Sequence, residues 1–171
     1  MNAQNAPLYT TIDSPIGELL LVGDGTALTR LHMQAAPRPV TPSPEWRRED
    51  EPFADVARQL SEYFAGERRE FDLPLALRGN EFELRVWAAL REIPYGETAS
   101  YGQIARAIGA ATAARAVGLA NGRNPISVIV PCHRVIGADG SLTGYGGGLP
   151  RKRYLLDLEA GALSLVSALT A

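Results

Sequence analysis

The sequence is poor in cysteine, in lysine and in long apolar segments. It has one cysteine among 171 residues, Cys132, which excludes an intramolecular disulfide and a cysteine-rich zinc or iron–sulfur site. No apolar run approaches the length that spans a membrane, and the first residues lack the basic and apolar regions of a signal peptide. We therefore expect a cytoplasmic protein without membrane association.

The remaining composition is that of a folded protein with unevenly distributed charge. Hydrophobic residues make up 46% and charged residues 21%, which is typical of one packed domain or two small ones. The formal net charge is −2, yet residues 98–153 carry seven basic side chains against Asp139 alone, a local charge of +6. Most basic residues are arginines, whose planar fork suits phosphate groups. Such a segment can attract a polyanion, although the same bias fits an ordinary solvated face.

Residues 1–79 are predicted to form a small α+β domain. Three short strands with tight turns between them are expected at Tyr9–Ile12, Glu18–Val22 and Ala27–Met33. A helix is expected to begin at Pro52 and to end at Gly66, because apolar residues recur between them at helical spacing. Residues 67–79 then read as an extended connector. These elements predict a small antiparallel sheet with one helix.

Residues 80–171 are predicted to form a second, mostly helical domain. Capping-box patterns mark helix starts at Asn80 and at Ser100, and a last helix is expected at Arg151–Glu159. A short helix at Thr112–Asn121 follows the second of these starts across a glycine-containing turn, which predicts a helix-turn-helix. The same spacing also fits an ordinary helical hairpin that packs a core.

The only cysteine follows an apolar, largely β-branched run. Residues 126–130 predict a buried strand or extended segment that ends at Pro131, and we expect the turn there to place Cys132 at an exposed mouth. The thiolate is the reactive form of cysteine, and the neighbouring His133 and Arg134 would favour it. The arrangement predicts a nucleophile, whereas a lone cysteine is more commonly buried and inert.

Four further residues could complete a site around this cysteine. Glu159, on the last predicted helix, could orient His133 in a Cys–His–Glu relay. Asn124 could bridge the backbone of two turns, and Tyr145 lies among glycines that allow close approach of a ligand. Tyr101 begins the first helix of the helix-turn-helix. The structural alternatives are a solvated carboxylate for Glu159, an Asx turn for Asn124 and a half-buried core tyrosine for Tyr101.

Several motifs between residues 80 and 160 together resemble one known family. They are Ile93-Pro94-Tyr95-Gly96, Arg115-Ala116-Val117-Gly118, Asn124-Pro125, Ile129-Val130-Pro131-Cys132-His133-Arg134-Val135, Gly144-Tyr145-Gly146-Gly147-Gly148 and Leu155-Leu156-Asp157-Leu158-Glu159. Their order and spacing are similar to those of the O6-alkylguanine-DNA alkyltransferases, also called methylated-DNA–protein-cysteine methyltransferases. The N-terminal third resembles this family only in strand pattern and size.

The resemblance implies direct-reversal DNA repair by a two-domain protein. Residues 1–79 would be a ribonuclease H-like domain, and residues 80–171 would bind DNA and accept the alkyl group. Members of the family transfer the alkyl group of O6-alkylguanine irreversibly to their own cysteine, here Cys132, and O4-alkylthymine is a further candidate substrate. The helix-turn-helix enters the minor groove, and the damaged base rotates out of the stack.

The resemblance also assigns roles to individual residues. His133 and Glu159 would draw the proton from Cys132 through a water between His133 and the sulfur, while the Tyr101 hydroxyl donates toward a purine ring nitrogen. The substrate pocket and its support would consist of Val135, Tyr145, Gly146 and Asn124. The DNA contacts would come from Thr112, Arg115, Ala116, Asn121 and Arg123, with Arg115 filling the space left by the departed base. The thioether product resists water, so each molecule would react once.

We expect no cofactor and no metal, because the N-terminal third has no cysteine and His32 as its one histidine. We expect a monomer that associates with the nucleoid and can bind double-stranded DNA cooperatively. The tail after Glu159 carries no motif. The main alternative is a helix-turn-helix regulator whose Cys132 is a sensor. A Cys–His hydrolase and a non-catalytic lesion binder are further alternatives, although Cys132 itself argues against the latter.

Overall fold

The computed structural model describes residues 5–163, whose helices and strands group into two compact units. The first unit contains residues 5–79 together with Pro125–Ile129, and the second contains Asn80–Asn124 together with residues 130–163. Within the described range, no helix is both long and apolar enough to cross a membrane. Residues 164–171, most of the tail after Glu159, lie outside this range.

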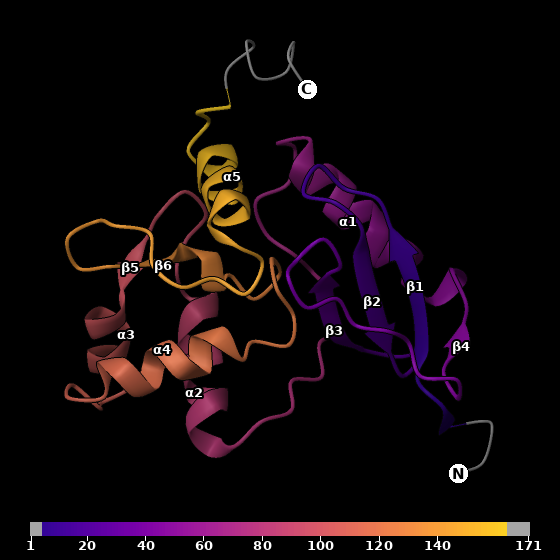
Figure 1. The fold of residues 1–171 in the computed structure, drawn as a ribbon, viewed down its shortest axis with the longest axis horizontal. Coiled ribbons are helices and arrows are strands. Elements are labelled where there is room, and N and C mark those ends of the chain that lie inside the picture. Colours follow the sequence, from indigo (N-terminus) through magenta and orange to yellow (C-terminus); the bar gives the residue numbers. More distant parts are fainter. Residues whose placement is uncertain (1–4, 164–171) are drawn as a thin grey trace. The chain divides into compact units, whose positions relative to one another are not determined.

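A four-stranded sheet in the order β3-β2-β1-β4 forms much of the first unit (Figure 1). Strands β1 (Leu8–Ile12), β2 (Leu19–Gly23) and β3 (Leu28–Met33) are antiparallel neighbours, as the sequence predicts. The edge strand β4 (Arg47–Arg48) pairs with β1 in parallel, so the sheet is mixed rather than wholly antiparallel. Two exposed arginines carry no hydrophobic pattern, which is why sequence periodicity missed β4.

After the sheet, the chain forms a 3-10 turn, η2 (Glu51–Phe53), and then helix α1 (Ala54–Phe64). Pro52 lies in the first turn, where its missing N–H would have no helical partner in any case. Leu60 and Tyr63 of α1 are fully buried, so the apolar residues at helical spacing face the core. The predicted helix is therefore present, and it begins within two residues of Pro52.

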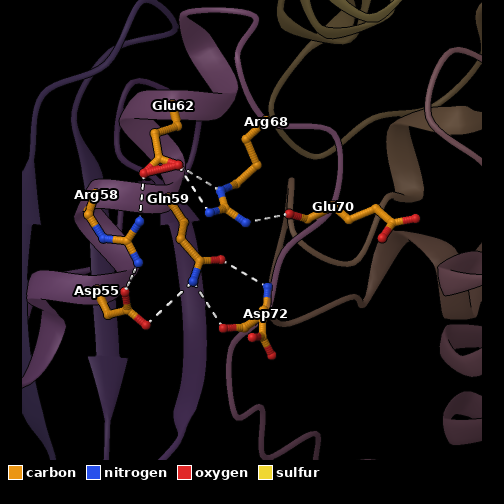
Figure 2. Close-up of polar contacts among 7 residues, drawn as sticks. All are labelled: Asp55, Arg58, Gln59, Glu62, Arg68, Glu70 and Asp72. Atoms are coloured by element: carbon orange, nitrogen blue, oxygen red, sulfur yellow. Dashed lines mark hydrogen bonds and ion pairs between the residues drawn. The ribbon is translucent and has the colours of Figure 1, made fainter.

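The connector after α1 is held against that helix by polar contacts (Figure 2). The Gln59 amide donates to the Asp72 carbonyl at 3.0 Å, and the Asp72 N–H donates back to the Gln59 side-chain oxygen at 2.9 Å. Arg68 pairs with Glu62 of α1 at 3.0 Å. Further on, the connector forms a parallel bridge with Leu28 of β3. The extended connector predicted from the sequence therefore packs on both the helix and the sheet of its own unit.

The second unit is mostly helical, as predicted. In chain order its elements are α2 (Glu81–Arg91), β5 (Ala99–Ser100), α3 (Tyr101–Ala107), α4 (Ala114–Gly122), η3 (Cys132–Arg134), β6 (Val135–Ile136) and α5 (Leu149–Glu159). Both predicted capping boxes are present, because the side chains of Asn80 and Ser100 each accept from the third helical N–H. Trp87 of α2 donates to the Ala120 carbonyl of α4 at 2.9 Å, which fixes these helices together.

Residues 126–130 do not form the strand that their composition predicts. Ile126 makes a single parallel bridge with Leu31 of the first unit's sheet, and the chain then turns. Val128 has φ 73°, in the left-handed region that β-branched residues rarely adopt. Ile126, Val128 and Val130 are nevertheless buried. The apolar run therefore indicated burial correctly, whereas packing around it decided the backbone conformation.

We expect Asn80→Ala to lower the free energy of unfolding by about 1 kcal/mol, because it removes the side-chain acceptor that caps α2. Asn80→Ser is the matched control, since serine supplies an equivalent acceptor and should retain most of the stability. Urea unfolding followed by circular dichroism measures both. Equal losses in the two variants would show that the cap contributes nothing.

Candidate active site

Cys132 begins the η3 turn directly after Pro131. Its N–H donates to the Val130 carbonyl at 2.8 Å, and the Arg134 N–H donates to the Pro131 carbonyl at 3.0 Å. The exposed mouth predicted from the sequence is wrong, because Cys132 is only 4% exposed. The η3 turn packs against α2 and α5, which cover it. A reaction partner must therefore enter the protein to reach the sulfur.

The Glu159 carboxylate, at the end of α5, is buried and accepts hydrogen bonds from several donors. His133 Nε2 lies 2.7 Å from one carboxylate oxygen, and Arg134 Nε lies 2.7 Å from the other. A second Arg134 nitrogen contacts the carboxylate at 3.1 Å, and a third donates to the Ile93 carbonyl at 2.7 Å. The guanidinium that we expected to favour a thiolate is therefore neutralised by Glu159 instead. The histidine and the glutamate come together as the relay hypothesis requires.

The two ring nitrogens of His133 have different surroundings. Nε2 contacts Glu159, whereas Nδ1 is buried and has no hydrogen-bond partner within residues 5–163. Burial lowers the pKa of His133, and the adjacent carboxylate opposes this shift only in part. The ring is therefore neutral near pH 7, with its proton directed at Glu159 and a lone pair on Nδ1. That nitrogen can accept a proton from a neighbouring thiol.

Burial raises the pKa of the Cys132 thiol, while a hydrogen bond from Asn124 and the charge of Lys152 act in the opposite direction. The Asn124 amide also donates to the Val130 carbonyl at 2.7 Å, so this side chain spans the turn before the cysteine. The resting group is a protected thiol at neutral pH. A base must take its proton before the sulfur can act as a nucleophile.

Lys152 is a feature of the site that the sequence analysis missed. Its side chain is fully buried, and its Nζ donates to the carbonyls of Val135 at 2.5 Å and Thr143 at 2.8 Å. Burial lowers its pKa, and the nearby Cys132 opposes this shift. The signal was its identity as the only lysine of the chain. Because Lys152 and Arg134 are both buried, neither contributes to the basic surface that residue counting suggested.

Tyr101, at the start of α3, shares a partner with this lysine. Its hydroxyl donates to the Thr143 carbonyl at 3.2 Å, the same oxygen that accepts from Lys152. The short β5–β6 pairing aligns Ala99 with Val135, which brings the start of α3 beside the chain that follows the cysteine turn. Val135 is itself fully buried. The start of α3 and the chain after the cysteine turn, which are far apart in sequence, therefore lie next to each other.

The loop before α5 contributes Tyr145 and Gly146. The Tyr145 hydroxyl is buried without a hydrogen-bond partner in the described part of the chain, and burial raises its pKa well above 10. Gly146 is exposed, and a Cβ placed there would meet open space. The unpaired buried hydroxyl of Tyr145 is available to a ligand, because an unmet hydrogen-bonding group favours any partner that reaches it.

The predicted DNA-contacting residues divide between two sides of α4. Arg115 and Ala116 are exposed, as are Thr112 before the helix and Arg123 after it. Asn121, in contrast, is only 4% exposed, and its amide donates to the Cys132 carbonyl at 3.4 Å. Its prediction as a DNA contact therefore needs correction, because helical periodicity turns this side chain inward toward the cysteine turn.

Models of two domains of one family match the chain. The 6-O-methylguanine DNA methyltransferase DNA-binding domain matches residues 81–161, and the ribonuclease-like domain of the same family matches residues 8–77. A methylated-DNA–protein-cysteine methyltransferase of Mycobacterium tuberculosis is 60% identical over 152 residues, covering 88% of this chain and 91% of the relative. A relative of the same description from Methanosarcina acetivorans is 52% identical over 151 residues, covering 88% and 97%.

The structural comparison agrees with these matches. The crystal structure of Mycobacterium tuberculosis OGT in complex with DNA has a TM-score of 0.86 and 56% identity, covering 96% of this chain and 99% of that one. The two matched domains define a DNA-binding methyltransferase with a ribonuclease-like first domain. This chain belongs to the 6-O-methylguanine DNA methyltransferase family. The predicted family and the predicted α+β fold are thereby confirmed.

We expect Glu159→Gln to lower the free energy of unfolding by about 3 kcal/mol, because it leaves the buried Arg134 without a counter-charge. Asp157→Asn is the control: this carboxylate is partly exposed and pairs with Arg153 at 4.0 Å, so its loss should cost less than about 0.5 kcal/mol. Urea unfolding compares the two. Similar small losses would disprove the central role of Glu159 in stability.

The lowered pKa of His133 predicts a pH dependence of stability. The unfolded chain has an ordinary histidine pKa of about 6.5 and so binds a proton at a pH where the folded ring does not. The free energy of unfolding should therefore fall as the pH drops from 7 to 5.5. His133→Gln removes the titrating group, and its urea midpoint should change less over this interval. Identical slopes for both proteins would contradict the assignment.

Proposed function

We propose that this chain is a methylated-DNA–protein-cysteine methyltransferase that repairs O6-alkylguanine in double-stranded DNA by direct reversal. The observation that carries the proposal is the buried contact of 2.7 Å between His133 and Glu159, directly beside the buried Cys132, on a domain that matches the DNA-binding family model. Residues 1–79 would support residues 80–171, which would bind DNA and perform the transfer. O4-alkylthymine is a second candidate substrate.

The proposed reaction begins with proton transfer. The Cys132 thiol gives its proton, through a bridging water, to Nδ1 of His133, and Glu159 stabilises the resulting imidazolium through Nε2. The thiolate attacks the alkyl carbon, a carbon–sulfur bond forms, and the carbon–oxygen bond to guanine breaks. Tyr101 donates toward a purine ring nitrogen and stabilises the guanine anion as it forms. In balance, the hydrogen of the thiol passes to guanine and the alkyl group passes to sulfur.

Burial of the sulfur requires the damaged base to leave the duplex. A guanine inside the stack cannot bring its alkyl carbon to a side chain that is 4% exposed, so we propose base flipping into the protein. The backbone around Val135 would read the exocyclic amine of the flipped base. Tyr145 and Gly146 would line the pocket near its oxygen, and Asn124 would hold the turn before the nucleophile.

The DNA surface in this proposal is the exposed side of α4. Arg115 would fill the space left by the flipped base, with Thr112 and Ala116 beside it and Arg123 toward the phosphates. Small residues suit the minor groove, because they let the helix backbone approach its floor. We further propose that the protein acts as a cytoplasmic monomer that can bind DNA cooperatively. A regulator with a sensor cysteine is the less favoured alternative, because the similar proteins described above are methyltransferases.

The product of the proposed reaction is a thioether, which water does not cleave. The chain has no second cysteine that could accept the group, so each molecule should act once. This scheme draws on the protein's own side chains and uses no cofactor. Among residues 5–163, no cluster of three or more histidine, cysteine or acidic side chains could hold a metal ion.

The decisive experiment uses a duplex oligonucleotide that contains O6-methylguanine. Incubation with excess duplex should place one methyl group on the Cys132 peptide of each protein molecule, as measured by peptide mass analysis. Cys132→Ser should lose transfer but retain affinity for duplex DNA in a gel-shift assay. An unchanged mass after prolonged incubation would refute the proposed function, and lost DNA binding in the variant would contradict the role given to the sulfur.

A further inference from the structure

One side of α4 is exposed at a regular helical spacing. The exposed positions are Arg115, Ala116, Leu119, Gly122 and Arg123, and the buried positions are Val117, Ala120 and Asn121. The exposed residues recur at i, i+1, i+4, i+7 and i+8, so they form one continuous stripe along the helix. A large aliphatic side chain therefore lies at the centre of the surface that the proposed function assigns to DNA.

Leu119 is unusually exposed for a residue of its size. Its exposed fraction is 61%, compared with 44% for Leu149 and 39% for Leu84. A single exposed leucine needs no explanation by itself. Leu119, however, lies four residues after Arg115 and four residues before Arg123, so a cation flanks it one turn away on each side. Among residues 5–163, no atom lies within 4 Å of a Cβ added at the neighbouring Gly122, so this position is open.

This arrangement matches the chemistry of a minor groove. Phosphates line the rim of the groove, whereas its walls are largely the C–H edges of sugars, and its width is about 6 Å. Arg123, which is exposed and lies 3.9 Å from Glu83, can reach the rim while the aliphatic group meets the walls and Arg115 occupies the space of the flipped base. Apolar side chains of minor-groove proteins also press between base steps and open the groove.

We propose that Leu119 is an apolar wedge for the minor groove, a proposal that rests on the proposed function. Leu119 presses against the sugar walls about 6 Å along the helix axis from Arg115, the advance of four helical residues. The wedge holds the groove open beside the site from which the guanine leaves. It acts as a positioning residue for the duplex and makes no contact with the reacting atoms. Reaction with a free base therefore does not need it.

The test compares Leu119→Ala with Leu84→Ala, a matched truncation of an exposed leucine on α2 in the same unit. Two rates of alkyl transfer to Cys132 are measured for each protein, one with an O6-methylguanine duplex and one with free O6-benzylguanine. Affinity for an undamaged duplex is measured at several salt concentrations. Thermal melting checks that both variants fold, which we expect because neither side chain is buried.

We expect Leu119→Ala to lower the duplex affinity and the duplex transfer rate about tenfold. A loss of this size is expected when one leucine side chain is no longer buried in the complex. The free-base rate should stay unchanged. The salt dependence of binding should also stay unchanged, because an apolar contact releases no counterions. Arg123→Ala should differ by showing a shallower salt dependence, because it removes a cation assigned to the phosphates. Leu119→Met should restore most of the duplex rate, because methionine retains the apolar volume.

Three results would overturn the wedge. The first is a Leu119→Ala protein that matches Leu84→Ala in duplex affinity and rate while the parent protein is active. The second is an equal loss of rate with duplex and with free base, and the third is an altered oligomeric state in sedimentation without a change in DNA binding. A parent protein whose Cys132 is alkylated by neither substrate would instead refute the proposed function, so the two failures are distinguishable.

Discussion

The second unit depends on the contacts of the buried Glu159 carboxylate. An anion in a protein interior is costly unless it is paired, and Glu159 is paired with both His133 and Arg134. These partners precede it by about 25 residues, so the contact closes the last helix onto the cysteine turn. The same carboxylate determines which nitrogen of His133 carries the proton. One contact thus closes the fold around the cysteine and prepares the base.

The burial of Cys132 also has two consequences. It keeps the thiol protonated at rest, which protects a sulfur that reacts only once in the proposed cycle. In the proposed function it also admits a substrate only after the base has left the duplex, so access itself would select for flipped nucleotides. Asn124 and Lys152 moderate the effect of burial, since both lower the pKa of the Cys132 thiol and so favour the thiolate. Burial therefore keeps the Cys132 sulfur protonated, while Asn124 and Lys152 keep its thiolate within reach of a base.

Helix α4 connects this chemistry to the surface. On its inner side, Asn121 reaches the Cys132 carbonyl, and Ala120 accepts a hydrogen bond from Trp87 of α2. On its outer side, Arg115 and Leu119 are exposed only a few residues away. In the proposed function, these inner contacts of α4 would relate the position of bound DNA to that of the nucleophile. The proposed function and the proposed wedge both depend on this short separation along α4.

The sequence by itself determined those features that depend on neighbouring residues. Turns, caps and periodicity act over a few residues, so they can be recognised in the sequence. They account for the helix caps at Asn80 and Ser100, for the pattern of three strands and for the Pro-Cys-His-Arg signature. Only the tertiary structure decided that residues 126–130 turn instead of forming a strand, and that Asn121 faces inward. It also decided that Lys152 and Arg134 are buried, because their partners lie 17 and 25 residues away. Whether a charge is stable in the interior depends on groups that folding brings to it, and no local pattern records them.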